Sequence, residues 1–136
     1  MNASATTSVT ATLVAEAERL DFLPAHFGCH FLQVERAVYA WMSELCATYR
    51  GGYWEFLSLS NGGGYLRTSE GEWQISVENG FSRTLSADAA GIVVTLFALS
   101  HLSFRFPESQ LGEQYHRLRE FVSAHPEGAL IFRAID

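Results

Sequence analysis

The chain has 136 residues, of which 48% are hydrophobic and 13% aromatic, which is enough to bury one core without metals or disulfides. Its net charge is −6, and its nine basic residues are all arginine and form no basic stripe. Because nucleic-acid binding needs clustered cations that neutralise phosphates, this composition argues against direct binding of nucleic acid.

Signals for membrane insertion and secretion are weak. The longest apolar run, GIVVTLFAL, has about half of the roughly 18 residues that a membrane span needs. The first residues carry neither basic side chains nor a leucine-rich stretch, so a secretory signal is not expected. We therefore expect a soluble cytoplasmic protein, without membrane contact, in which Cys29 and Cys46 stay reduced.

Predicted structure begins after a flexible N-terminus at residues 1–8, and residues 9–136 are expected to form one domain. Residues 9–14 favour an edge strand because they are rich in β-branched side chains. A turn or short helix follows, in which Pro24 is expected to hold Leu23 outside helical geometry.

The middle of the chain predicts one helix and then a series of strands. Apolar side chains recur at helical spacing from Phe31 to Tyr49, which predicts an amphipathic helix that Gly51 and Gly52 end. Four β-prone runs follow, separated by the turn sequences NGGG, SEGE and NG, and they predict an antiparallel meander. The strands are expected at residues 53–60, 65–68, 73–78 and 81–86.

The last third of the chain is predicted to be helical. Ser86 is the expected N-cap of a helix, and Asp88 lies in its first turn, where a carboxylate favours the positive end of the helix dipole. Apolar residues on all sides predict that this helix is buried and that Pro107 ends it. A third helix is expected from about Leu111 to Ala124, and the final ALIFRAID favours a helix over a terminal strand. The fold class is α+β, with an antiparallel β-meander packed against three to four helices.

Residue types that carry chemistry are present, but their spacing does not predict a catalytic site. His26, Cys29, His30 and Cys46 are metal-ligand types, and a small metal-dependent enzyme built on them is the alternative hypothesis. The second half of this motif has a single ligand, so a buried thiol and partly exposed imidazoles are favoured. His101 lies four helical turns from Ser86, too far for a nucleophilic pair. No catalytic residue, metal or cofactor is therefore predicted.

Several uncommon sequence words occur in order along the chain. They are ERLDFLPAHFG from Glu18, LCATYRGGYWEFLSLSNGG from Leu45, SADAAGIVVTLFAL from Ser86, YHRLREF from Tyr115 and the closing HPEGALIFRAID. In these words the chain resembles the antirestriction proteins of the ArdB/KlcA family, small products of plasmids and other mobile elements. The resemblance implies a non-enzymatic inhibitor in the bacterial cytoplasm whose partner is a type I restriction-modification enzyme complex.

The manner of inhibition and the partner surface are predicted from charge and aromatic content. Acidic residues alternate with arginine, as in EAERLD and HRLRE, so the dense carboxylates of a DNA mimic are missing. Charged residues inside apolar words, together with exposed aromatic rings, favour one mixed interface patch if the aromatic strand and both chain ends lie together. Core packing of the rings and unrelated surface charges are the alternative. The candidate partner-binding residues are Arg19, Tyr53, Trp54, Glu55, Asn61 and Asp136.

Overall fold

The computed structural model describes residues 8–136 as one α+β unit, which confirms the predicted fold class. The predicted flexible N-terminus covers residues 1–8, of which only Ser8 is among the described residues. Among the described residues the strands are β1 (Ala11–Leu13), β2 (Trp54–Leu59), β3 (Gly64–Thr68), β4 (Glu72–Ser76) and β5 (Ser82–Ser86). The helices are α1 (Arg19–Phe27), α2 (Phe31–Leu45), α3 (Ala87–Arg105), α4 (Leu111–Val122) and α5 (Gly128–Ile135), with short 3-10 turns before α1 and α2.

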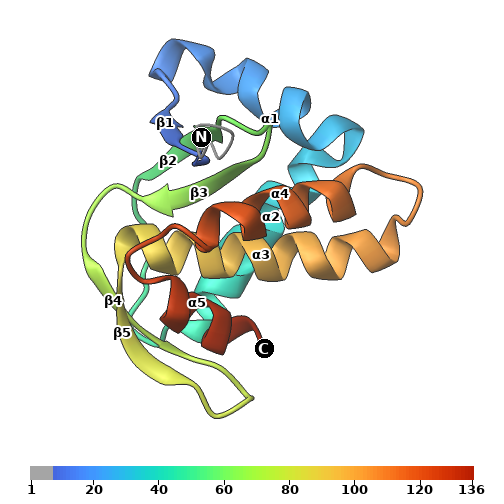
Figure 1. Ribbon diagram of the computed structural model, residues 1–136. Coiled ribbons are helices and arrows are strands. Elements are labelled where there is room, and N and C mark those ends of the chain that lie inside the picture. The colour runs from blue at the N-terminus through green and yellow to red at the C-terminus, as the bar shows by residue number, and fades with distance from the viewer. Residues whose placement is uncertain (1–7) are drawn as a thin grey trace, which may run out of the picture.

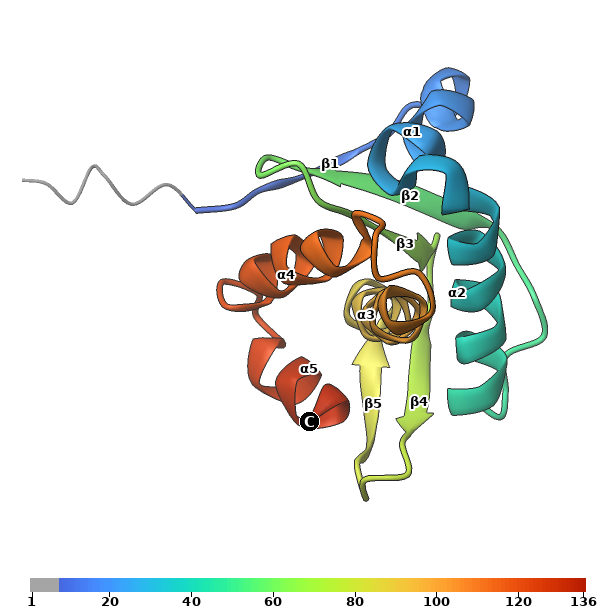
Figure 2. The same ribbon diagram turned by 90° about the vertical axis from the view of Figure 1, so that its right-hand side faces the viewer.

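Helix α3 is the centre of the fold. Seen end-on in Figure 2, it is surrounded by β3, α2, the β4–β5 hairpin, α5 and α4. Eleven of its 19 residues are buried, as the apolar sequence predicts. By length and composition α3 would also suit a membrane span, but 61% of its apolar window is buried inside the protein. Its hydrophobicity is therefore accounted for by its place in the core.

The strands form two separate sheets rather than one meander (Figure 1). β1 is an edge strand that pairs with β2, and β2 pairs with β3, all antiparallel, while β4 pairs only with β5. The predicted continuity fails after Thr68: β3 and β4 do not pair, and Gly71 turns the chain with a φ of +111° just before β4. The bond from the Ala87 N–H to the Gly71 carbonyl extends the β4–β5 ladder to the start of α3.

Two predicted helix boundaries are wrong. Leu23 is helical, and Pro24 lies inside α1, because Leu23 is buried against the core and packing outweighs the one backbone hydrogen bond that proline removes. The lost bond belongs to the Leu20 carbonyl, in a residue whose side chain is 89% exposed, so water can replace it. Helix α2 ends at Leu45, and the buried Cys46 is already extended, well before the two glycines.

The C-terminal helices agree with the sequence pattern. α3 ends at Arg105, two residues before Pro107, and α4 follows. ALIFRAID is helical, as favoured, in α5. α4 and α5 both pack against α3, and their buried residues complete the core on that side (Figures 1 and 2).

Candidate functional site

Side-chain hydrogen bonds of Ser86 and Glu127 hold the N-terminus of α3. The Ser86 hydroxyl accepts the Ala89 N–H at 3.1 Å, which is the geometry of an N-cap. The same hydroxyl donates to Glu127 at 2.5 Å, and the Ser86 N–H donates to that carboxylate at 3.0 Å. Because Glu127 directly precedes α5, these bonds join the start of α3 to the start of α5.

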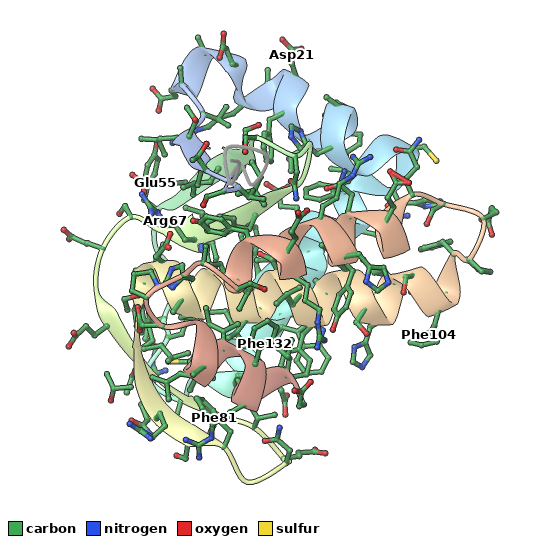
Figure 3. The ribbon with its side chains drawn as sticks, in the orientation of Figure 1. Asp21, Glu55, Arg67, Phe81, Phe104 and Phe132 are labelled. Atoms are coloured by element: carbon green, nitrogen blue, oxygen red, sulfur yellow. The ribbon has the colours of Figure 1, made fainter. Side chains whose placement is uncertain are left out.

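Asp88, two residues further on, is the centre of a network that also contains Glu55, Tyr65, Arg67 and His125. Its Oδ1 accepts the Tyr65 hydroxyl and the Arg67 Nη1, each at 2.6 Å. Its Oδ2 lies 2.7 Å from Nε2 of His125. Arg67 also contacts Glu55 at 3.0 Å, and Figure 3 shows these two side chains next to each other at the strands. We call this set the Asp88 network.

Hydrogen bonding indicates the tautomer of His125. Its Nδ1 accepts the Glu127 N–H at 2.9 Å, so the ring proton is on Nε2 and is donated to Asp88. The His125 side chain is only 6% exposed. The imidazole therefore orients the chain between α4 and α5 and is not available to a ligand.

The Asp88 carboxyl and the Tyr65 hydroxyl in this network have shifted pKa values. Burial alone would raise the pKa of Asp88, but hydrogen bonds from His125, Tyr65 and Arg67 lower it to about 2. Burial and the bond to Asp88 raise the pKa of Tyr65 above its usual range. Three donors thus occupy the one carboxylate, which stays charged at neutral pH. The network has the character of a structural joint between β3, α3 and the α4–α5 turn.

A surface hollow of about 410 Å³ lies beside the start of α1, and we call it the Arg19 pocket. The guanidinium carbon of Arg19 is 4.8 Å from the ring centre of Tyr53 and 5.4 Å from that of Phe56, which is cation–π geometry. Trp54 is 6% exposed and donates its indole N–H to the Tyr49 hydroxyl at 2.9 Å. The lining residues are Arg19, Tyr39, Tyr49, Gly51, Gly52, Tyr53, Trp54 and Phe56.

The structure brings together three of the six residues predicted to bind a partner. Arg19, Tyr53 and Trp54 line the Arg19 pocket. Glu55 alternates to the other side of β2 and contacts Arg67 in the Asp88 network. Sequence reasoning missed Tyr49, and its position four residues before Tyr53 in an aromatic loop was the available signal.

Asn61 and Asp136 lie on other parts of the molecule. The Asn61 side chain donates to the Arg117 carbonyl and to Glu120, each at 2.9 Å, so it ties the β2–β3 turn to α4. Asp136 follows α5 and lies 3.9 Å from Arg119. Figures 1 and 2 place α5 and the C-terminus at the opposite end of the molecule from α1. A single patch of all six residues is therefore not formed.

The four residues of the metal hypothesis do not form a site either. His26 stacks on Phe22 and bonds its carbonyl, while His30 stacks on Phe106. Cys29 is exposed and Cys46 is buried. Across residues 8–136 no three His, Cys, Asp or Glu side chains have the arrangement that holds a metal ion. The alternative of a metal-dependent enzyme thus has no geometric basis in these residues.

A second hollow, of about 560 Å³, lies between α2, α3 and the end of β4, and we call it the Trp41 groove. Its floor is aromatic, since the rings of Trp41 and Phe97 stack with centres 4.8 Å apart and His101 lies beside them. Glu44 and Glu78 are among the lining residues, so the groove is apolar with an acidic edge.

Comparison with known proteins shows that this is the fold of the antirestriction proteins. The chain belongs to the antirestriction protein family, whose model matches residues 47–136. It is 51% identical to the antirestriction protein KlcA of Escherichia coli over 94% of this chain and 95% of that protein. It is 39% identical to the uncharacterized protein YafX of Escherichia coli K12, covering 94% of this chain and 88% of YafX.

A solved structure has the same fold over its whole length. It is 50% identical to this chain, covers 100% of both chains and superposes with a TM-score of 0.88. It comes from a structural study of the KlcA and ArdB proteins. These proteins are described there as having a novel fold and antirestriction activity against type I DNA restriction systems in vivo but not in vitro.

Proposed function

We propose that this protein relieves restriction by type I restriction-modification systems in the cytoplasm of bacteria that carry it on a plasmid or other mobile element. One observation carries the proposal. A relative with the same fold over 100% of both chains and 50% sequence identity is described as active against type I systems in vivo. The family match over residues 47–136 supports the same conclusion.

Inhibition by protein contact, rather than by imitation of DNA, is favoured by the distribution of charge. A DNA mimic presents regularly spaced free carboxylates, about one negative charge per 1.7 Å of duplex axis. In this protein Glu55 and Asp88 share Arg67, and Glu113 pairs with Arg117. These three carboxylates are neutralised within the fold, so they leave gaps in any negative surface that would imitate a duplex.

A non-enzymatic role is favoured by the chemistry of the two polar sites. In the Asp88 network the carboxylate and the imidazole are occupied by each other and by backbone groups, so neither is free to act on a substrate. The Arg19 pocket offers a cation and aromatic rings, which bind groups but do not attack them. We therefore propose that Arg19, Tyr53 and Trp54 form the surface that binds a protein partner.

The relatives' activity in vivo but not in vitro bears on the identity of this partner. An inhibitor that bound the restriction enzyme tightly by itself would act in a purified mixture. We therefore propose that the restriction complex is countered together with a further cellular component, which the purified reaction lacks.

Phage plating tests the proposed function. Unmodified phage is plated on a host with a type I system, with and without expression of this protein, and on an isogenic host without the system. We expect expression to raise the plating efficiency on the restricting host and to leave it unchanged on the other. Unchanged plating on the restricting host, with soluble protein present, would refute the proposal. Phage already modified by the host system provides the control for general effects on growth.

A further inference from the structure

Arg19 is a cation without a carboxylate partner among the described residues, in a protein whose net charge is −6. Its Nε is buried and has no hydrogen-bond acceptor among residues 8–136. Leaving a buried donor unsatisfied costs about 1–3 kcal/mol, so folded proteins seldom keep one without a purpose. At the edge of a surface pocket, the missing acceptor can come from a bound molecule.

A second donor faces the same pocket. The Tyr49 hydroxyl oxygen accepts the indole N–H of Trp54, and its own proton has no acceptor among residues 8–136. The nearby acids bond to other tyrosines, Glu35 to the Tyr39 hydroxyl and Glu16 to the Tyr53 hydroxyl, each at 3.1 Å, and among the described residues neither bonds to Tyr49. The pocket lining contains no carboxylate at all. The polar groups of the pocket that still lack a partner are therefore hydrogen-bond donors, and donors bind anions.

The walls of the pocket specify what must accompany that anion. Aromatic side chains provide most of the surface, and the ring of Tyr53 is 52% exposed. Gly51 and Gly52 have φ values of +94° and +150°, and a Cβ on either would meet no atom within 4 Å. Here the two glycines leave open space through which an extended backbone can approach the rings. Flat or apolar groups next to the anion would pack on these rings.

We propose that the Arg19 pocket binds an acidic peptide segment of a protein partner, with a carboxylate on Arg19 and Tyr49 and an adjacent aromatic side chain on Tyr53. This inference rests on the proposed function, because it names the chemistry of the partner surface. The guanidinium forms charge-assisted hydrogen bonds with a carboxylate, and the rings below it hold its plane in place. Since the protein as a whole is acidic, it repels acidic segments elsewhere on its surface, so binding depends on Arg19.

Titration with a model peptide tests the pocket directly. The probe is an acetylated and amidated Gly-Phe-Asp-Gly, and its control has asparagine in place of aspartate. The readout is the indole N–H signal of the three tryptophans in nitrogen-15 NMR spectra. We expect the Asp peptide, and not the Asn peptide, to shift the Trp54 signal, since its indole bonds to Tyr49. The Trp41 signal, from the Trp41 groove, should stay in place.

Two variants complete the test. Arg19→Gln should weaken binding of the Asp peptide at least about tenfold, the effect of losing a charged hydrogen-bond partner. Arg36→Gln removes the same charge from an exposed position on α2 outside the pocket, and it should bind like the wild type. If Arg19→Gln does not fold, the comparison of the two peptides on the wild type still decides. Equal response to both peptides, or a Trp54 shift with adenosine monophosphate and not with the Asp peptide, would overturn the inference.

Plating and titration separate the two proposals. If the wild-type protein raises plating efficiency but the Asp peptide does not shift its Trp54 signal, the inference about the pocket is wrong and the proposed function stands. If the peptide binds as expected but plating does not rise, the pocket is real and the proposed function is wrong.

Discussion

Replacing Asp88 by alanine should destabilise the fold well beyond the loss of a favourable helix-dipole contact. That contact alone is worth about 0.3–1 kcal/mol in the first turn of a helix. In this structure, however, the Asp88 carboxylate accepts bonds from Tyr65, Arg67 and His125. In the variant Arg67 keeps its ion pair with Glu55, whereas the Tyr65 hydroxyl and the His125 N–H lose their acceptor.

The magnitude follows from these lost contacts. An unsatisfied buried donor costs about 1–3 kcal/mol. The fall in the pKa of Asp88 from 3.8 to about 2 corresponds to ~2.4 kcal/mol, at ~1.36 kcal/mol for each tenfold change. Because the side chain is 27% exposed, solvent screening reduces that figure to about 1–2 kcal/mol. We expect Asp88→Ala to lower the free energy of unfolding by about 2–4 kcal/mol at neutral pH, since the two contributions overlap.

The pH dependence gives an independent check on the same residue. A carboxyl whose pKa is lowered by folding stabilises the folded state above its unfolded pKa, and this stabilisation is lost as the pH falls toward the folded pKa. Between about pH 5 and pH 2, the wild type should therefore lose about 1–2 kcal/mol more than Asp88→Asn, which does not titrate.

Urea denaturation at several pH values measures both effects. Asp21→Ala is the matched control, because Asp21 also lies in the first turn of a helix but points away from the protein, at the top of Figure 3. It should cost at most about 1 kcal/mol. If Asp88→Ala costs no more than Asp21→Ala, or if Asp88→Asn follows the acid profile of the wild type, the network does not have the stabilising role described here.

Two further predictions concern packing and nucleic acid. Gly91→Ala should cost about 3 kcal/mol or more, because its Cβ would clash with the Leu66 carbonyl oxygen and lie 2.6 Å from the Arg67 Cβ. Gly112→Ala on α4 is the control, since its Cβ would meet only Ser103 at 3.8 Å, and it should be stabilising by about 0.5–1 kcal/mol in denaturation experiments. Equal effects of the two changes would contradict the packing described for α3. In a gel-shift assay the purified protein should not bind duplex DNA at physiological salt, because nine scattered arginines provide no phosphate-binding stripe; salt-sensitive binding below about micromolar concentration would show otherwise.

Features that depend on local pattern were predictable from the sequence. Helix α3 is apolar on all sides and starts at a serine with the side-chain geometry of an N-cap, so its burial and its start follow from neighbouring residues alone. The same holds for α5, whose apolar residues recur at helical spacing. The β-branched residues of β1 indicate a strand locally, but its partner β2 lies far along the chain.

Features that depend on distant contacts were not predictable. Asp88 bonds to His125, 37 residues away, and to Tyr65, 23 residues away, and no spacing rule indicates either pair. The split between the two sheets falls between β3 and β4, although the SEGE sequence between them has the turn residues of a hairpin. Pro24 is tolerated in α1 because the tertiary burial of Leu23 outweighs a local preference.

The candidate site shows the same division. Tyr53 and Trp54 are neighbours in sequence and were predicted at the start of one strand, which begins at Trp54 in the structure. That Arg19 lies over Tyr53, while Asp136 lies at the other end of the molecule, depends on how α1 packs on α2 and how α5 packs on α3. Charge inside an apolar word was therefore an informative signal at Arg19, but it did not indicate which charged residues share a surface.

The most direct test of the central claim is the plating efficiency of unmodified phage on a type I restricting host that expresses wild-type, Arg19→Gln or Arg36→Gln protein at equal soluble levels. The account predicts that the wild type and Arg36→Gln raise plating efficiency and that Arg19→Gln, folded by its denaturation curve, does so much less. Failure of the wild-type protein to raise plating efficiency on that host would contradict the account.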